Sequence, residues 1–537
     1  MVDSKPLLAE LEKRLGSWAS LERGPRPDDL CARVERADDV PSAVAELRAA
    51  GLGLATLVAT DERASPDRDL KLRYIFEPAA ARLGPLPDVF VTLLASLDPV
   101  HPQVPSIAAE VASANWHERE AHDLFGISFI DHPDPRPLVV HDGWPKGMYP
   151  LRKDFDARQR LPVEPAEEFP HLVVDGEGVF EVPVGPIHAG IIEPGHFRFS
   201  TVGEVVLHVE ARLFYTHRGL EKRMEGMSLA DAFIVAERMC GVCSVAHGLG
   251  FCEAAELIAG VEVPARARVL RSLTLELERL YNHLGDIGNI AAGASYHYGT
   301  SAGLRMKESV QQVNERLTGH RFLRGLLVPG GVLLDLSPET ARAIEAVLAS
   351  CGEGLASLVE RIENNPSFID RVDRTGRLKL RDTIELGVTG VGARASGVDR
   401  DARRDHPHAA YAGRDVKVAT QSDGDVHARL DVRAAEAQES IRLIRTFLAD
   451  LPAGPLSVPL PRVLPVGKIG YASIESPRGA SVHWLRSDGA GRVDRYHLRS
   501  ASFANWPAVP LAAVGDIIPD FPLVNKSFEL CYACTDR

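Results

Sequence analysis

The chain has 537 residues, 45% of them hydrophobic and 25% charged, which is enough for at least two globular domains. Its formal net charge of −13 disfavours nucleic acid as a partner, because phosphate binding needs a basic surface. Seven cysteines, sparse and odd in number, do not resemble a secreted disulfide framework, and no apolar run reaches the length of a membrane span. We therefore expect a cytoplasmic protein, which can still dock onto a membrane complex.

Residues 1–155 predict a small α/β domain. Its short apolar runs have strand or buried-helix character: Gly53–Thr60, Leu70–Glu77 and Val89–Leu97. Residues 156–180 are polar, acidic and proline-containing, which is typical of a linker. The remaining residues, 181–537, predict a second, larger domain.

The second domain begins with short strands broken by Gly and Pro over Gly185–Leu213. Apolar residues at helical spacing then predict long buried helices: Leu229–Ile258, Ala265–Ile290, Leu304–Leu317, Pro338–Glu363 and Arg429–Leu451. Gly387–Tyr411 is loop-like, and the chain after Pro452 predicts Gly/Pro-rich segments, short strands and a tail. The predicted fold class is α+β, with a small α/β N-terminal domain followed by a large, mainly helical bundle domain with peripheral short strands.

Two Cys-x-x-Cys pairs, Cys240/Cys243 and Cys531/Cys534, lie far apart in this domain. A local zinc ribbon would place its pairs roughly 15–20 residues apart, so here the whole intervening chain must fold to bring the thiolates together. Spacing alone favours a four-thiolate metal site, with zinc and a binuclear centre both open. Disulfides and inert buried thiols stay as alternatives. The isolated cysteines are interpreted as small buried hydrophobes: Cys31, Cys252 and Cys351.

The residues around both pairs resemble a known family. Residues 237–247 (ERMCGVCSVAH) are similar to the N-terminal nickel-binding motif of nickel–iron hydrogenase large subunits, and residues 531–537 (CYACTDR) to the C-terminal motif of their membrane-associated group. Residues 118–126 resemble the 30 kDa subunit of respiratory complex I, and the rest resembles its 49 kDa subunit. This fused layout is that of the formate hydrogenlyase (hydrogenase 3 and hydrogenase 4) type.

The resemblance implies a nickel–iron centre with Cys240 and Cys531 terminal on nickel, and Cys243 and Cys534 bridging nickel to iron. Cyanide and carbon monoxide would complete the coordination of the iron. It implies reversible reduction of protons to dihydrogen. Soft thiolate donors suit nickel and iron, and a nearby base must handle the proton.

Three further residues take roles from the same resemblance. Glu193 is the candidate proton relay, with a loop carboxylate that caps a turn as the alternative. Arg478 would place its guanidinium beside the diatomic ligands of iron, unless it is a surface salt-bridge residue. His247 would donate to a bridging sulfur, or is a hydrogen-bonded core histidine.

The chain departs from the family pattern at three places. Glu221 matches a glutamate that holds a structural magnesium, but Arg537 stands where the family has the partner histidine, so the magnesium is left undecided. Glu529-Leu530 replaces the usual Asp-Pro before Cys531. The sequence ends at the C-terminal motif, so we expect either a mature form or a gene that lacks the cleaved extension.

By resemblance, the partners are a small hydrogenase subunit with an iron–sulfur cluster, ferredoxin-like subunits, membrane arm subunits and a formate dehydrogenase. The expected location is peripheral, on the cytoplasmic face of the inner membrane. Competing functions are a complex I-like quinone oxidoreductase subunit (an NADH dehydrogenase 30/49 kDa fusion), a zinc-bearing scaffold, and a hydrogenase coupled to carbon monoxide dehydrogenase or ferredoxin. Complex I relatives lack the four cysteines, which favours the hydrogenase.

Overall fold

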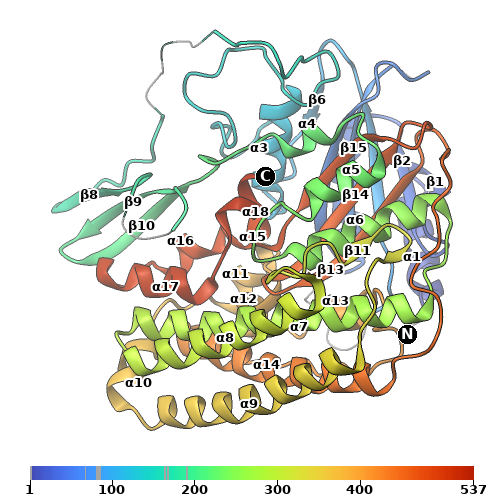
Figure 1. The fold of residues 1–537 in the computed structure, drawn as a ribbon. Coiled ribbons are helices and arrows are strands. Elements are labelled where there is room, and N and C mark those ends of the chain that lie inside the picture. The colour runs from blue at the N-terminus through green and yellow to red at the C-terminus, as the bar shows by residue number, and fades with distance from the viewer. Residues whose placement is uncertain (1–2, 67, 80–85, 163–164, 166–168, 189–191) are drawn as a thin grey trace.

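The computed structural model describes residues 3–66, 68–79, 86–162, 165, 169–188 and 192–537. It confirms the mixed α and β architecture, with a strand-rich N-terminal part followed by a helical part (Figure 1). Long helices lie side by side at the bottom of the view, and the strands of the N-terminal sheet and β13 to β15 (within residues 469–499) lie at the upper right. In the described part of the chain, no helix is both long and apolar enough to cross a membrane.

The N-terminal part is a five-stranded sheet with the strand order β1-β2-β5-β4-β3, in which β2 and β5 pair in parallel. Its strands are β1 (Ala19–Arg23), β2 (Leu30–Val34), β3 (Leu52–Asp61), β4 (Leu70–Pro78) and β5 (Val91–Leu97). The three predicted apolar runs are thus strands rather than buried helices. Helices α1 (Lys5–Leu15) and α2 (Val40–Ala49) share a core with one face of this sheet.

The other face of this sheet packs against three strands near the end of the chain, β13 (Ile469–Ser476), β14 (Gly479–Ser487) and β15 (Val493–Arg499). Val58 and Ile75 form a buried cluster there with residues such as Trp484. Since α6 (Ser244–Ala259) packs on β13 and β14 as well, these strands lie inside the molecule. The sequence did not anticipate this position. The first and last parts of the chain therefore form one packed body, in which N-terminal side chains reach C-terminal ones.

The helical part is built around α7 (Ala265–Gly293), which is buried along most of its length and packs against α8 (His297–Thr318), α14 (Val426–Ala449) and α17 (Phe521–Phe528). Its long helices are α5 (Leu229–Ala236), α6 (Ser244–Ala259), α7 (Ala265–Gly293), α8 (His297–Thr318), α9 (Pro338–Glu363) and α14 (Val426–Ala449). Four of the five predicted helices are confirmed. The prediction of a single helix over Leu229–Ile258 was wrong, because a turn at residues 237–243 separates α5 from α6.

Two predicted irregular segments contain helices instead. Gly387–Tyr411 forms α12 (Gly390–Arg394) and α13 (Ala402–Asp405), because Arg394 and Arg403 are buried against Glu475 at 3.0 Å and Glu276 at 3.0 Å. The C-terminal tail also folds as short helices: α15 (Ala501–Asn505), α16 (Ala508–Ala512), α17 (Phe521–Phe528) and α18 (Tyr532–Asp536).

The remaining elements are short and connect these layers. They are α3 (Ala114–Phe125), β6 (Gln103–Pro105), β7 (Ser128–Ile130), β8 (Val179–Val184), β9 (His196–Val202), β10 (Val205–Arg212), α4 (Leu220–Met224), β11 (Leu327–Val328), β12 (Gly331–Val332), α10 (Pro366–Val372) and α11 (Leu380–Glu385). Strands β8 to β10 form the sheet that projects at the left of Figure 1. The described residues between 156 and 178 contain no helix or strand, and the domain boundaries stay a prediction.

Candidate metal centre

The two cysteine pairs meet in the interior of the protein, each in a turn that leads into a helix. Cys240 and Cys243 precede α6, and Cys531 precedes α18, which contains Cys534. The thiol of Cys534 lies 2.9 Å from the Sγ atom of Cys240. The sequence prediction that the pairs converge therefore agrees with the structure, although the roles of the single residues stay predictions.

The first turn is held by a carboxylate from α7. Cys243 is the N-cap residue of α6 but provides no side-chain cap. Glu278 takes this role, since its carboxylate accepts the N–H groups of Val245 at 2.7 Å and Ala246 at 3.0 Å. One turn further along α7, Asn282 donates to the carbonyl oxygen of Val242 at 2.9 Å. Helix α7 thus fixes the orientation of this cysteine pair.

The second turn is held by Glu193. Cys531 caps α18 through its own sulfur, which accepts the N–H of Cys534 at 3.4 Å. The Glu193 carboxylate accepts the N–H of Ala533 at 2.9 Å, between the two cysteines. Burial and the neighbouring Cys531 sulfur raise the pKa of Glu193. Glu193 therefore caps this turn, which is the alternative interpretation from the sequence. The relay role stays a prediction, and the position of the carboxylate beside the Cys531 sulfur is compatible with it.

His247 lies one helical turn beyond Cys243. Its Nε2 atom is 3.1 Å from the sulfur of Cys534, within reach of a hydrogen bond to that sulfur. Ligand atoms of Cys240, Cys243, His247 and Cys534 all lie within 4.8 Å of one another, and all four residues are buried. Cys531 lies close enough to Cys240 to shift the pKa of that thiol.

The thiols shift one another's pKa values in opposite directions. Hydrogen bonds with Cys240 and Cys534 lower the pKa of Cys243 to about 6. A hydrogen bond with Cys240 raises the pKa of Cys531 to about 12. Without a cation, the buried thiols therefore share their protons instead of all ionising. A bound soft metal would remove this conflict, because thiolates are its preferred ligands.

Arg478 is buried and is held by Asp286 of α7. Its two terminal nitrogens both donate to the Asp286 carboxylate, Nη2 at 3.0 Å. Arg433 donates to the same carboxylate at 3.2 Å, and against the effect of burial these guanidinium groups hold the pKa of Asp286 well below its usual range. Arg478 is close enough to Cys243 for its charge to favour the thiolate. The surface salt-bridge alternative for Arg478 is thereby wrong.

Gly390 of α12 explains how the Arg478 backbone is accommodated. It has φ +67°, and a Cβ atom there would lie 2.4 Å from the Arg478 carbonyl oxygen. Glu529, one of the departures from the family pattern, also lies near Arg478, with its carboxylate 4.0 Å from Arg478 Nη2. Burial raises the pKa of Glu529 to about 7. Its longer side chain therefore still brings a carboxyl group to this guanidinium.

The sequence interpretation missed Glu278, Asn282 and Asp286. All three lie on α7 at intervals of four residues, so they share one face of a buried helix. Polar residues at helical spacing within an otherwise buried apolar segment were the available signal. Their partners could not be found from that signal, because the contacts join segments far apart in the sequence.

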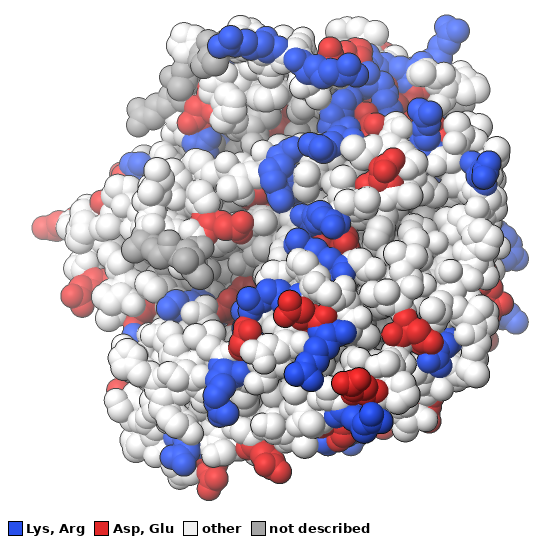
Figure 2. Space-filling model, in the orientation of Figure 1, with Lys and Arg blue, Asp and Glu red and all other residues white. Residues whose placement is uncertain are grey.

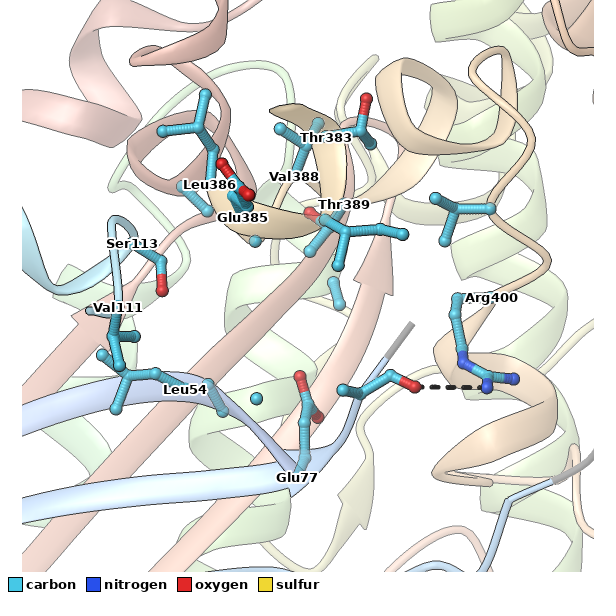
Figure 3. Close-up of a pocket in the computed structure, with 18 of the residues that line it drawn as sticks. Leu54, Glu77, Val111, Ser113, Thr383, Glu385, Leu386, Val388, Thr389 and Arg400 are labelled. Carbon is cyan, nitrogen blue, oxygen red and sulfur yellow. Dashed lines mark hydrogen bonds between the residues drawn. The ribbon is translucent and has the colours of Figure 1, made fainter. Parts of the chain in front are cut away.

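A cavity of about 470 Å³ lies elsewhere, between β3, β4, α11 and α12 (Figure 3). None of the predicted site residues lines it. Figure 3 shows Glu77, Thr389 and Arg400 around the hollow, and Arg400 donates to the carbonyl oxygen of Ala79 at 3.4 Å. This cavity is therefore separate from the four-cysteine cluster.

His406, which lines this cavity, makes stability depend on pH. It lies between Glu77 at 2.9 Å and Asp88 at 2.7 Å, and against the effect of burial these carboxylates raise its pKa from 6.5 to about 9. Because the pKa of His406 is higher in the folded state, its protonation stabilises the folded protein. This stabilisation is complete below pH 6.5 and is lost as the pH rises through about 9. The expected contribution is about 3 kcal/mol.

Thermal melting of His406→Gln checks this prediction. We expect the wild-type advantage over the variant to be greatest at about pH 6 and to vanish at about pH 10. An exposed residue, His101, provides the control, and His101→Gln should melt like the wild type at every pH. An advantage over His406→Gln that does not change with pH would contradict this account.

Comparisons with known proteins agree with this geometry. Residues 218–285 match the family described as nickel-dependent hydrogenase. Residues 296–470 and 463–537 match the 49 kDa subunit of respiratory-chain NADH dehydrogenase, and residues 33–161 match its 30 kDa subunit. Two of the matched segments each contain one cysteine pair.

Relatives and a solved structure extend the similarity over most of the chain. Formate hydrogenlyase subunit 5 of Escherichia coli is 34% identical over 453 residues, 83% of this chain and 79% of that protein. The carbon monoxide-induced hydrogenase of Rhodospirillum rubrum is 32% identical, covering 67% and 99%. A chain of the membrane-bound sulfane sulfur reductase, an archaeal respiratory membrane complex, matches with a TM-score of 0.63 and 26% identity, covering 67% and 99%.

Proposed function

Because the chain belongs to the nickel–iron hydrogenase large-subunit family of the formate hydrogenlyase type, we propose that it is a catalytic subunit that interconverts protons, electrons and dihydrogen. One observation carries the proposal. Thiols from the two ends of the second predicted domain come within 2.9 Å of each other beside a buried arginine and a half-buried glutamate. A complex of this chain with its partner subunits should evolve dihydrogen from a reduced artificial donor, and a metal-loaded complex without this activity would contradict the proposal.

The residues fit a nickel–iron group. Cys240 and Cys531 would be terminal on nickel, and Cys243 and Cys534 would bridge the metals. Two buried nitrogens also have no hydrogen-bond partner among the described residues, Nε of Arg478, which is a donor, and Nδ1 of His247. The Arg478 donor suits the cyanide or carbon monoxide ligands that we propose on iron. When bound, the group supplies the centre at which dihydrogen is split heterolytically or formed.

This chain's own residues supply proton handling and order. Glu193 lies at the α18 turn, where burial and the Cys531 sulfur raise the pKa of its carboxyl group, and we propose that this group exchanges the proton with the metal centre. Arg478, fixed by Asp286, keeps a positive charge in a buried setting. In the tautomer with a proton on Nε2, His247 donates to the Cys534 sulfur and lowers the basicity of that sulfur.

Replacing Glu193 tests its part in proton transfer. We expect Glu193→Gln to lower hydrogen evolution by about 10²- to 10⁴-fold, the usual contribution of general acid–base catalysis, while nickel content stays unchanged. The amide keeps an oxygen that accepts the Ala533 N–H, so α18 remains capped. Glu204→Gln, at an exposed turn before β10, should behave like wild type. Equal rates for Glu193→Gln and wild type would exclude the relay role.

The solved structure that matches this chain belongs to an archaeal respiratory membrane complex. We propose that this chain also works in a membrane-associated assembly, with a small subunit that holds an iron–sulfur cluster, ferredoxin-like subunits, membrane arm subunits and a formate dehydrogenase. Its proposed place is the cytoplasmic face of the inner membrane. Figure 2 shows a band of Lys and Arg down the middle of one face, despite the net charge of −13. Such a band can orient acidic partners.

We further propose a 30 kDa-like domain (1–155), a linker (156–180) and a 49 kDa-like domain (181–537).

The match to NADH dehydrogenase subunits favours a second candidate, a quinone oxidoreductase subunit without metal. The four converging cysteines support the hydrogenase instead, because a metal-free function gives no reason for four buried thiols around one point. Quinone reduction by a nickel-free complex would favour the second candidate. Among hydrogenases, the electron donor (formate, carbon monoxide dehydrogenase or ferredoxin) can be separated by assaying each donor with the same complex.

A further inference from the structure

A second buried cluster of possible metal ligands lies beside the four-cysteine centre. Glu120, Glu221 and His497 place one ligand atom each within 4.8 Å of one another. The three residues come from α3 in the N-terminal part, from α4 and from β15. Carboxylates and an imidazole at this distance form a donor set for a divalent cation such as Mg²⁺ or Mn²⁺.

The side chain of Arg537 occupies this donor set. Its Nη1 atom donates to Glu221 at 2.8 Å and to the carbonyl oxygen of Leu498 at 2.7 Å, and its Nη2 atom donates to Glu120. Arg495 donates to the other Glu221 oxygen at 2.8 Å. Two carboxylates thus already face two guanidinium groups, and a divalent cation would add charge to a balanced cluster. The residues do not fit magnesium.

The same arginine belongs to the segment that carries the metal-binding cysteines. Arg537 follows Cys534 by one helical turn, and its N–H donates to the Ala533 carbonyl at 3.1 Å. Asp536 also holds this turn in place, since its carboxylate accepts the N–H groups of Phe214 at 3.0 Å and Thr216 at 2.9 Å. A displacement of Arg537 would therefore be transmitted to the Cys534 sulfur.

We propose that the Arg537 guanidinium serves as the structural cation of this cluster in place of a divalent metal. It ties α18 to Glu120 of the N-terminal part and positions Cys531 and Cys534 for metal binding. Arg537 is thus a positioning residue, and the integrity of the nickel site depends on contact with the N-terminal part. The inference rests on the proposed function only in assuming that the four cysteines bind nickel.

Divalent-cation binding of the purified complex tests the proposal. For wild type, we expect no bound Mn²⁺ at the cluster by electron paramagnetic resonance and no change in melting temperature on treatment with EDTA. Arg537→His removes the guanidinium and adds an imidazole to Glu120, Glu221 and His497. This variant should bind about one Mn²⁺ per chain and melt higher when Mn²⁺ or Mg²⁺ is added. Arg445→His, on the exposed side of α14, should show neither effect.

Nickel content supplies the second readout. Arg537→Ala should retain at least about ten-fold less nickel than wild type, within the range known for changes around a metal site. Glu120→Gln, which keeps the arginine and weakens one ion pair, should lose nickel in part. Mn²⁺ bound to wild type at this cluster, or full nickel content in Arg537→Ala, would overturn the proposal. If wild type holds no nickel, the proposed function fails, but the Mn²⁺ experiment on Arg537→His still decides the role of Arg537.

Discussion

Replacing either Cys243 or Cys531 with alanine will abolish both nickel retention and hydrogen turnover. Each change removes one of the buried thiols that converge from the two turns, and the remaining donors cannot complete a four-sulfur set. The loss of nickel and of activity should be larger than the loss of about 10- to 100-fold that follows changes to residues around the ligands. Nickel analysis and hydrogen evolution with an artificial donor, measured on the same preparation, check both parts.

Cys351→Ala is the matched control for these two variants. Cys351 is equally buried, but it lies on α9 and packs in the hydrophobic core of the helical part. Its replacement should cost some stability and leave nickel content and turnover per nickel unchanged. Full hydrogen turnover in Cys243→Ala or Cys531→Ala would contradict the assignment of the cluster.

Arg478→Lys will lower hydrogen turnover sharply while nickel remains bound. Both terminal nitrogens of Arg478 donate to Asp286, and its buried Nε donor has no hydrogen-bond partner among the described residues. A lysine keeps the charge but has no planar fork, so it cannot bind Asp286 and present a second donor in the same geometry. The expected decrease is about 10²- to 10³-fold, the usual cost of removing one preorganised donor from an active site.

The control for this variant is Arg445→Lys, because Arg445 pairs with Glu345 on the exposed side of α14. That change should leave turnover and nickel content unchanged. Measuring nickel alongside the rate separates a catalytic loss from a collapsed site. If Arg478→Lys turns over at the wild-type rate with full nickel, Arg478 has no part in the reaction.

The sequence was informative where the chemistry lies in short motifs. The cysteine pairs, Glu193 and His247 each stand in such a motif, and the structure brings them together. Long apolar helices such as α7 and α9 were also predictable, because their periodicity extends over many turns. The turn between α5 and α6 could not be separated from a helix, since Cys240 and Cys243 continue the apolar pattern.

Contacts between distant segments could not be predicted. Asp286 reaches Arg478 from α7, and Glu278 caps α6 from the same helix, but only the folded bundle shows these pairs. The position of β13 to β15 against the N-terminal sheet depends equally on long-range packing. The contact of Arg537 with Glu120 joins the C-terminal segment to α3 of the N-terminal part, and no local sequence pattern predicts it.

The most direct test of the central claim is the nickel, iron and zinc content of the chain, purified anaerobically with its partner subunits from its own host. The account predicts about one nickel and one iron per chain, after the iron of partner clusters is subtracted, because four soft thiolates select these metals in a binuclear centre. Zinc without nickel, or no metal at all, would contradict it and would favour a scaffold or a complex I-like role despite the converging cysteines.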